Sequence, residues 1–157
     1  MLGGIVAETS WAEVLEQIER LLERPYWVVD LLPVQVPAHG AGQFFAVEQL
    51  LLTGPRGDSL RRAFADVLLC LNCYFDFVVV LDEDETGLVN PDPKILDNWV
   101  RDGRRSLSIV LVGVDVLIQV TPQSTCMTVY NSSPDLLKML EKLAVAAGLF
   151  LWQPGEA

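Results

Sequence analysis

Apolar residues recur every three or four positions in four stretches of the chain, and this spacing predicts four amphipathic helices. The first runs from Trp11 to Arg24, and Ser10 with Glu13 reads as a capping box at its start. The last is the best marked, because Ser133 can cap it and Gly148 can end it in the left-handed conformation. The other helices and the last one cover about 58–72, 93–103 and 134–147.

Shorter runs rich in β-branched and aromatic residues predict strands. We expect Tyr26 to Leu32 at a sheet edge, because Pro33 and Pro37 remove backbone donors. Phe75 to Leu81 is aliphatic on both faces and therefore predicts an interior strand. Gln43 to Leu52 fits either a helix or a buried strand, and we interpret it as a strand. Further strands are predicted at about 107–112, 115–121, 125–131 and 149–152.

The order of these elements is α-β-β-α-β-α-β-β-β-α-β, which combines hairpin-like neighbours with longer crossovers. This order favours a single α+β domain over residues 1–157, with a mixed or mainly antiparallel sheet and about four helices packed on it. An antiparallel sheet with all four helices on one face is the alternative. The length of 157 residues suits one such domain.

Composition and charge narrow the class of protein. Apolar residues make up 51% of the chain, which excludes a disordered protein, and the formal charge of -10 argues against nucleic acid as a partner. The longest apolar run, Ile109 to Val114, is too short to span a membrane, and the first residues carry no basic signal-peptide region. We therefore expect a soluble cytoplasmic protein with no nucleic-acid or membrane partner.

Four consecutive carboxylates follow the predicted interior strand. The stretch Val78 to Thr86 resembles the strand and Asp-x-Asp-x-Thr signature of haloacid-dehalogenase-type phosphatases, in which one aspartate attacks phosphorus and the other acts as acid and base. The same residues resemble a calcium-binding EF-hand loop, although Pro93 stands where a bidentate glutamate is needed. We expect an exposed candidate binding loop without a bound metal or cofactor, made of Asp82, Glu83, Asp84 and Glu85.

Cysteine, histidine and arginine give weaker signals. Cys70 and Cys73 form a C-x-x-C at the predicted end of a helix, where the dipole disfavours a thiolate, and we expect buried, inert side chains. His39 is the only histidine and is a candidate binding residue in a glycine-containing loop. The sequence leaves open whether six arginines gather into an anion site: Arg56, Arg61, Arg62, Arg101, Arg104 and Arg105.

Every catalytic pattern in the chain lacks an obligatory member, so we predict a non-catalytic protein-interaction module of the immunity-protein or adaptor kind. The alternative is a small-molecule-binding protein or a divalent-metal-dependent phosphohydrolase that uses Asp82 to Glu85. Large apolar side chains in excess of one small core predict a homodimer or a complex with a partner protein. The candidate interface residues are Tyr26, Trp27, Phe44, Phe45 and Trp152.

Overall fold

The computed structural model describes residues 4–5, 8–33, 50, 53–81, 86–122 and 126–154. Its strands are β1 (Gly4–Ile5), β2 (Tyr26–Asp30), β3 (Phe77–Leu81), β4 (Thr86–Val89), β5 (Leu107–Leu111), β6 (Val116–Val120), β7 (Cys126–Tyr130) and β8 (Phe150–Trp152). Its helices are α1 (Glu8–Leu21), α3 (Gly57–Tyr74), α4 (Pro93–Asp102) and α5 (Pro134–Ala146).

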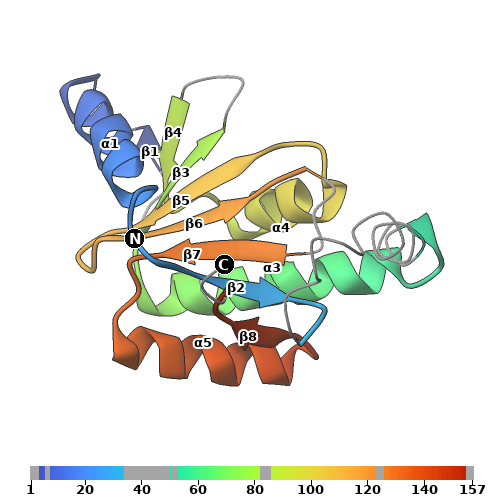
Figure 1. The fold of residues 1–157 in the computed structure, drawn as a ribbon. Coiled ribbons are helices and arrows are strands. Elements are labelled where there is room, and N and C mark those ends of the chain that lie inside the picture. The colour runs from blue at the N-terminus through green and yellow to red at the C-terminus, as the bar shows by residue number, and fades with distance from the viewer. Residues whose placement is uncertain are drawn as a thin grey trace.

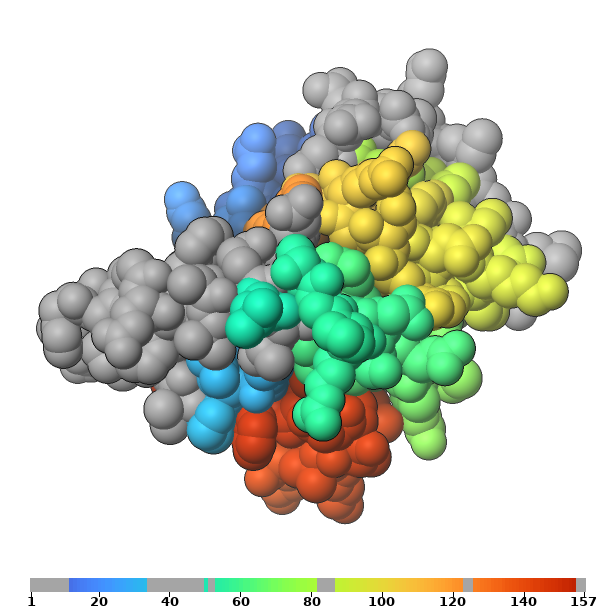
Figure 2. All heavy atoms as spheres, turned by 90° about the vertical axis from the view of Figure 1, so that its right-hand side faces the viewer, coloured from blue at the N-terminus to red at the C-terminus, as the bar shows by residue number. Residues whose placement is uncertain are grey.

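The strands form one eight-stranded sheet in the order β1-β4-β3-β5-β6-β7-β2-β8, and every pair of neighbours is antiparallel. Helices α3, α4 and α5 cover one face of this sheet, and α1 covers part of the other (Figure 1). Figure 2 shows the start of α3 between α4 and α5. The predicted α+β class is confirmed with the antiparallel sheet, and the alternative with all four helices on one face is wrong.

The central strands explain why both faces need helices. Successive side chains of a strand point to opposite faces, and all five residues of β3 are buried. Phe77 and Val79 pack into the larger core under α3, α4 and α5, whereas Val78 and Val80 pack with Ile18 of α1. The prediction that this aliphatic segment is an interior strand is confirmed, because β3 lies between β4 and β5.

The predicted ends of the last two helices are confirmed. The carboxylate of Asp92 accepts a hydrogen bond of 2.8 Å from the backbone of Lys94 at the start of α4. In the same way, the hydroxyl of Ser133 accepts from the backbone of Leu136 at 3.2 Å. Gly148 follows α5 with a φ of 79°, a conformation that glycine adopts without steric cost.

The first two helices begin earlier than the sequence predicts. Helix α1 starts at Glu8, so Ser10 lies inside the helix and is not its cap. It ends at Leu21, three residues before the predicted end at Arg24, where Pro25 disfavours helical angles. Helix α3 starts at Gly57 without a side-chain cap, one residue before the predicted start.

Two predictions about strands are corrected. Strand β2 is not at an edge but lies between β7 and β8; it ends at Asp30, so the prolines that follow remove no donor from the ladder. Of the segment predicted as a strand over 43–52, only Leu50 is described, and it is helical, with its carbonyl accepting from Gly54 at 2.8 Å. Strands β1 and β4 were not predicted.

Candidate functional site

Several predicted site residues lie outside the described residues. These are the acidic candidates and histidine (Asp82, Glu83, Asp84, Glu85 and His39) and two interface candidates (Phe44 and Phe45). Their binding and interface roles stay predictions. Tyr26, Trp27 and Trp152 are described and can be placed on the sheet.

Aromatic side chains from β7, β2 and β8 share one face of the sheet. Tyr26 pairs with Tyr130 across β2 and β7, and two positions further along β2, Val28 pairs with Trp152 of β8. Phe150 lies opposite Asp30, again two positions on. Because paired residues and every second residue point to the same side, these aromatic side chains lie on the face that also carries α1. We call Tyr26, Tyr130, Phe150 and Trp152 the aromatic strip.

Two contacts hold the side chains of the strip in place, and its two ends along β2 are exposed. The rings of Tyr26 and Tyr130 have centroids 5.4 Å apart and are tilted by 41°, a favourable arrangement for aromatic pairs. Burial raises the pKa of the Tyr130 phenol. Trp152 donates from Nε1 to the carbonyl of Leu32 at 3.1 Å. Tyr26 and Phe150 keep 40% and 44% of their surface exposed, so each end of the strip offers an apolar contact to a partner.

The structure divides the predicted interface set. Trp27 is half-buried and pairs with Val129, which lies in the core under α3 and α5, so it points to the opposite face from Tyr26. Tyr130 and Phe150 join the strip, although neither was among the predicted interface residues. Alternation within each predicted strand is the signal that could have found them, because Phe150 and Trp152 flank an inward Leu151.

A buried carboxylate lies at the end of β2, beside Phe150. Asp30 accepts a hydrogen bond of 3.1 Å from the backbone of Leu32, which holds the turn that leaves the strand. Burial raises the pKa of Asp30, and the hydrogen bonds from the backbones of Leu32 and Leu31 partly oppose this rise. The strip therefore has a buried carboxylate next to Phe150, the apolar side chain at one of its ends.

The exposed side of α1 and the turn that follows it add negative charge on the same face of the sheet. Glu13, Glu16, Glu19 and Glu23 are exposed, and within the described part of the chain none of them forms an ion pair. Neighbouring carboxylates on a helix repel one another modestly. The exposed Arg24 offsets one of these charges, and the remaining negative charge can attract a cationic partner.

Two of the six arginines, Arg101 and Arg105, line one hollow together with acidic side chains. An open hollow of about 530 Å³ lies beside α4 and is lined by Asp58, Asn98, Trp99, Arg101, Asp102 and Arg105. Arg101 donates from Nη2 to both carboxylate oxygens of Asp58, at 2.9 and 3.0 Å, and lies 3.5 Å from Asp97. Two aspartates balance two arginines in this lining, so the hollow has no surplus of positive charge for an anion.

The prediction that Cys70 and Cys73 are buried is wrong, because both side chains are exposed. In the part of the chain that the structure describes, no three histidine, cysteine or acidic side chains lie close enough to hold a metal ion. None of the described helices is both long and apolar enough to cross a membrane. No protein-family model, curated protein or solved structure matches this chain.

Proposed function

We propose that this α+β protein is a non-catalytic interaction module that binds a basic partner protein through the aromatic strip. The observation that carries the proposal is the strip itself: aromatic side chains from three adjacent strands share one sheet face, and Tyr26 and Phe150 at its ends are exposed. Aromatic residues are enriched at the energetic centres of protein interfaces. A sheet face that presents aromatic rings suits a protein surface better than a small ligand, which prefers a concave pocket.

Charge favours a basic partner over a second copy. The chain carries a formal charge of -10, so two copies repel each other at long range, whereas a cationic protein is attracted. Helix α1 leads through four residues into β2, and on this segment Glu19 and Glu23 are balanced by Arg20 and Arg24, so the attraction comes from the charge of the whole chain. The apolar strip would supply most of the affinity, and the carboxylates would speed association.

The test compares a double variant of the strip with a single-site control, using each protein to capture partners from extracts of the native cell. One variant replaces both exposed ends of the strip, Tyr26→Ser with Phe150→Ser. The control, Val145→Ser, removes a side chain that is 66% exposed on α5, across the sheet from the strip. The proposal expects a basic protein that wild type and the control retain and that the strip variant loses, and the purified pair should then bind with at least tenfold weaker affinity for the strip variant.

Other outcomes are equally decisive. Equal retention of every protein by both variants would overturn the strip as the binding surface. Sedimentation that shows a dimer of wild type and of the control, but a monomer of the strip variant, would make a second copy the occupant, as the predicted homodimer requires. An acidic partner would contradict the proposed role of charge.

A further inference from the structure

Two exposed thiols lie on one side of α3 at its C-terminal end. Cys70 and Cys73 are three positions apart, so they are neighbours on the helix surface, and Cys73 is the residue before the helix ends at Tyr74. Cysteine is among the residue types most often buried, and a pair of exposed cysteines is therefore unusual. The thiols are free in this structure.

We propose that Cys70 and Cys73 form a redox site that closes reversibly to a disulfide by exchange with a low-molecular-weight disulfide such as oxidised glutathione. Cβ atoms three positions apart on a helix are about 5–6 Å from each other, whereas a disulfide needs about 3.5–4.5 Å. The last turn of a helix can tighten to 3₁₀ geometry, which brings the two Cβ atoms closer. A disulfide formed in this way is strained, and strained, exposed disulfides are the easily reduced ones.

The reaction proceeds in two exchanges. The thiol of Cys73 donates to the carbonyl of Leu69 at 3.4 Å, which holds its proton, and Cys70 is therefore the sulfur that attacks first. The helix dipole disfavours the attacking thiolate at this end of α3, so we expect the exchange to be slow. Cys70 loses its proton and displaces one glutathione thiolate, which leaves a mixed disulfide on the protein. Cys73 then loses its proton and attacks the sulfur of Cys70, and the second glutathione leaves. Two protein thiols are oxidised, and one glutathione disulfide is reduced to two thiols.

Asn72, one of the two residues between the cysteines, gives this reaction a structural consequence. Asn72 donates from Nδ2 to the carbonyl of Phe75 and to Oδ1 of Asn90, both at 3.1 Å. Oδ1 of Asn90 also accepts from the backbone of Phe77 at 2.8 Å, so one side chain joins the end of α3 to the start of β3 and the end of β4. Tightening the turn from Cys70 to Cys73 displaces Asn72 from these contacts. Oxidation is thus expected to loosen the connection between α3 and the sheet.

The test treats the full chain with oxidised glutathione in a Cys126→Ser background, which removes the remaining cysteine. The proposal expects an intact mass lower by about two units, the loss of two hydrogen atoms, with full reversal by dithiothreitol. Cys70→Ser should leave Cys73 largely unmodified, whereas Cys73→Ser should leave a stable glutathione adduct on Cys70. The oxidised protein should melt a few degrees lower than the reduced protein.

A second variant tests the structural consequence. Asn72→Ala removes the contacts that oxidation is proposed to break, so oxidation should no longer change its melting temperature although the disulfide still forms. Products that carry only glutathione adducts or intermolecular disulfides would overturn the redox site. An unchanged oxidation-induced shift in Asn72→Ala would overturn the link to the sheet.

Discussion

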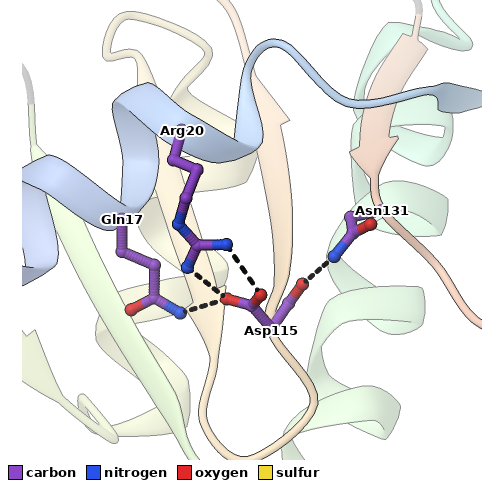
Figure 3. A network of polar contacts seen from close by, with 4 residues as sticks. All are labelled: Gln17, Arg20, Asp115 and Asn131. Carbon is purple, nitrogen blue, oxygen red and sulfur yellow. Dashed lines mark hydrogen bonds and ion pairs between the residues drawn. The ribbon is translucent and has the colours of Figure 1, made fainter.

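Arg20 and Asp115 lie 95 positions apart in the sequence, and their side chains form a bidentate ion pair with both N···O distances at 3.0 Å. Gln17 donates to the same carboxylate at 2.8 Å, and Asn131 donates to the backbone carbonyl of Asp115 at 2.9 Å (Figure 3). The contacts join α1 to the turn between β5 and β6 and to the end of β7. They fix α1 over one part of the sheet, beside the aromatic strip.

Two substitutions of Asp115 distinguish the effect of its ion pair from the effect of its backbone conformation. Its φ is 53°, in the left-handed region that asparagine tolerates and alanine resists. Asp115→Asn removes the charge pair and keeps the backbone preference, whereas Asp115→Ala loses both. We expect the alanine variant to be less stable than the asparagine variant by about 1 kcal/mol, measured by urea denaturation. Equal stability of the two variants would contradict this account of the turn.

Stability should depend on the charge of Asp115 at low pH. Hydrogen bonds from Arg20, and then from Gln17, lower the pKa of Asp115 below its ordinary value. The folded state therefore binds the proton less tightly than the unfolded state, whose aspartate pKa is about 3.9. The contribution is fully present above that pH and is lost as the pH falls through the lowered value. The stability advantage of wild type over Asp115→Asn should shrink over this range, and added salt should reduce it, because the pair is partly exposed.

Two adjacent leucines test how α1 is held on the sheet. Leu21 is fully buried against the inner cluster of β3, β5 and β6, whereas Leu22 is 40% exposed. Leu21→Ala should lower the free energy of unfolding by about 2–5 kcal/mol, because it removes a buried side chain and leaves a cavity. Leu22→Ala should lower it by less than about 1 kcal/mol. Similar losses for the two variants would show that α1 packs in another orientation.

Most of the fold could be predicted from local patterns. The meander of β5, β6 and β7 and the caps at Asp92 and Ser133 follow from alternation and capping chemistry that act over a few residues. The position of β2 inside the sheet could not be predicted, because it depends on pairing with β8, more than a hundred residues later. Strand pairing over such distances leaves no signal within β2 itself.

The candidate site was predicted only in part for the same reason. The sequence identifies Tyr26 and Trp152 as large aromatic side chains. They lie on the same face of the sheet only because Val28 of β2 pairs with Trp152 of β8. Trp27 has the same apolar character and lies on the other face, since neighbours in a strand alternate. The exposure of Cys70 contradicts the statistical preference of cysteine for the interior, and only the helix orientation on the sheet reveals it.

The buried carboxylate of Asp30 should give a pH dependence opposite in sign to that of Asp115. Burial raises the pKa of Asp30 above that of an unfolded aspartate. Between the two pKa values the folded state binds more protons, so the contribution of Asp30 to stability is full below about pH 4 and is lost as the pH rises through the raised value. Asp30→Asn cannot titrate, and its amide oxygen can still accept from the backbone of Leu32.

Wild type should therefore lose stability relative to Asp30→Asn as the pH rises from about 4 towards neutrality, and melting curves of both proteins at each pH measure this difference. Asp115→Asn serves as the control of opposite sign, because wild type gains on that variant as the pH rises from the acid side. A constant difference between wild type and Asp30→Asn would mean that the carboxylate has the same proton affinity in the folded and unfolded states. Hydrogen bonds from the backbones of Leu32 and Leu31 and from the side chain of Trp152 lower the pKa of Asp30, so a trend like that of Asp115 would show that these bonds together outweigh burial at the end of β2.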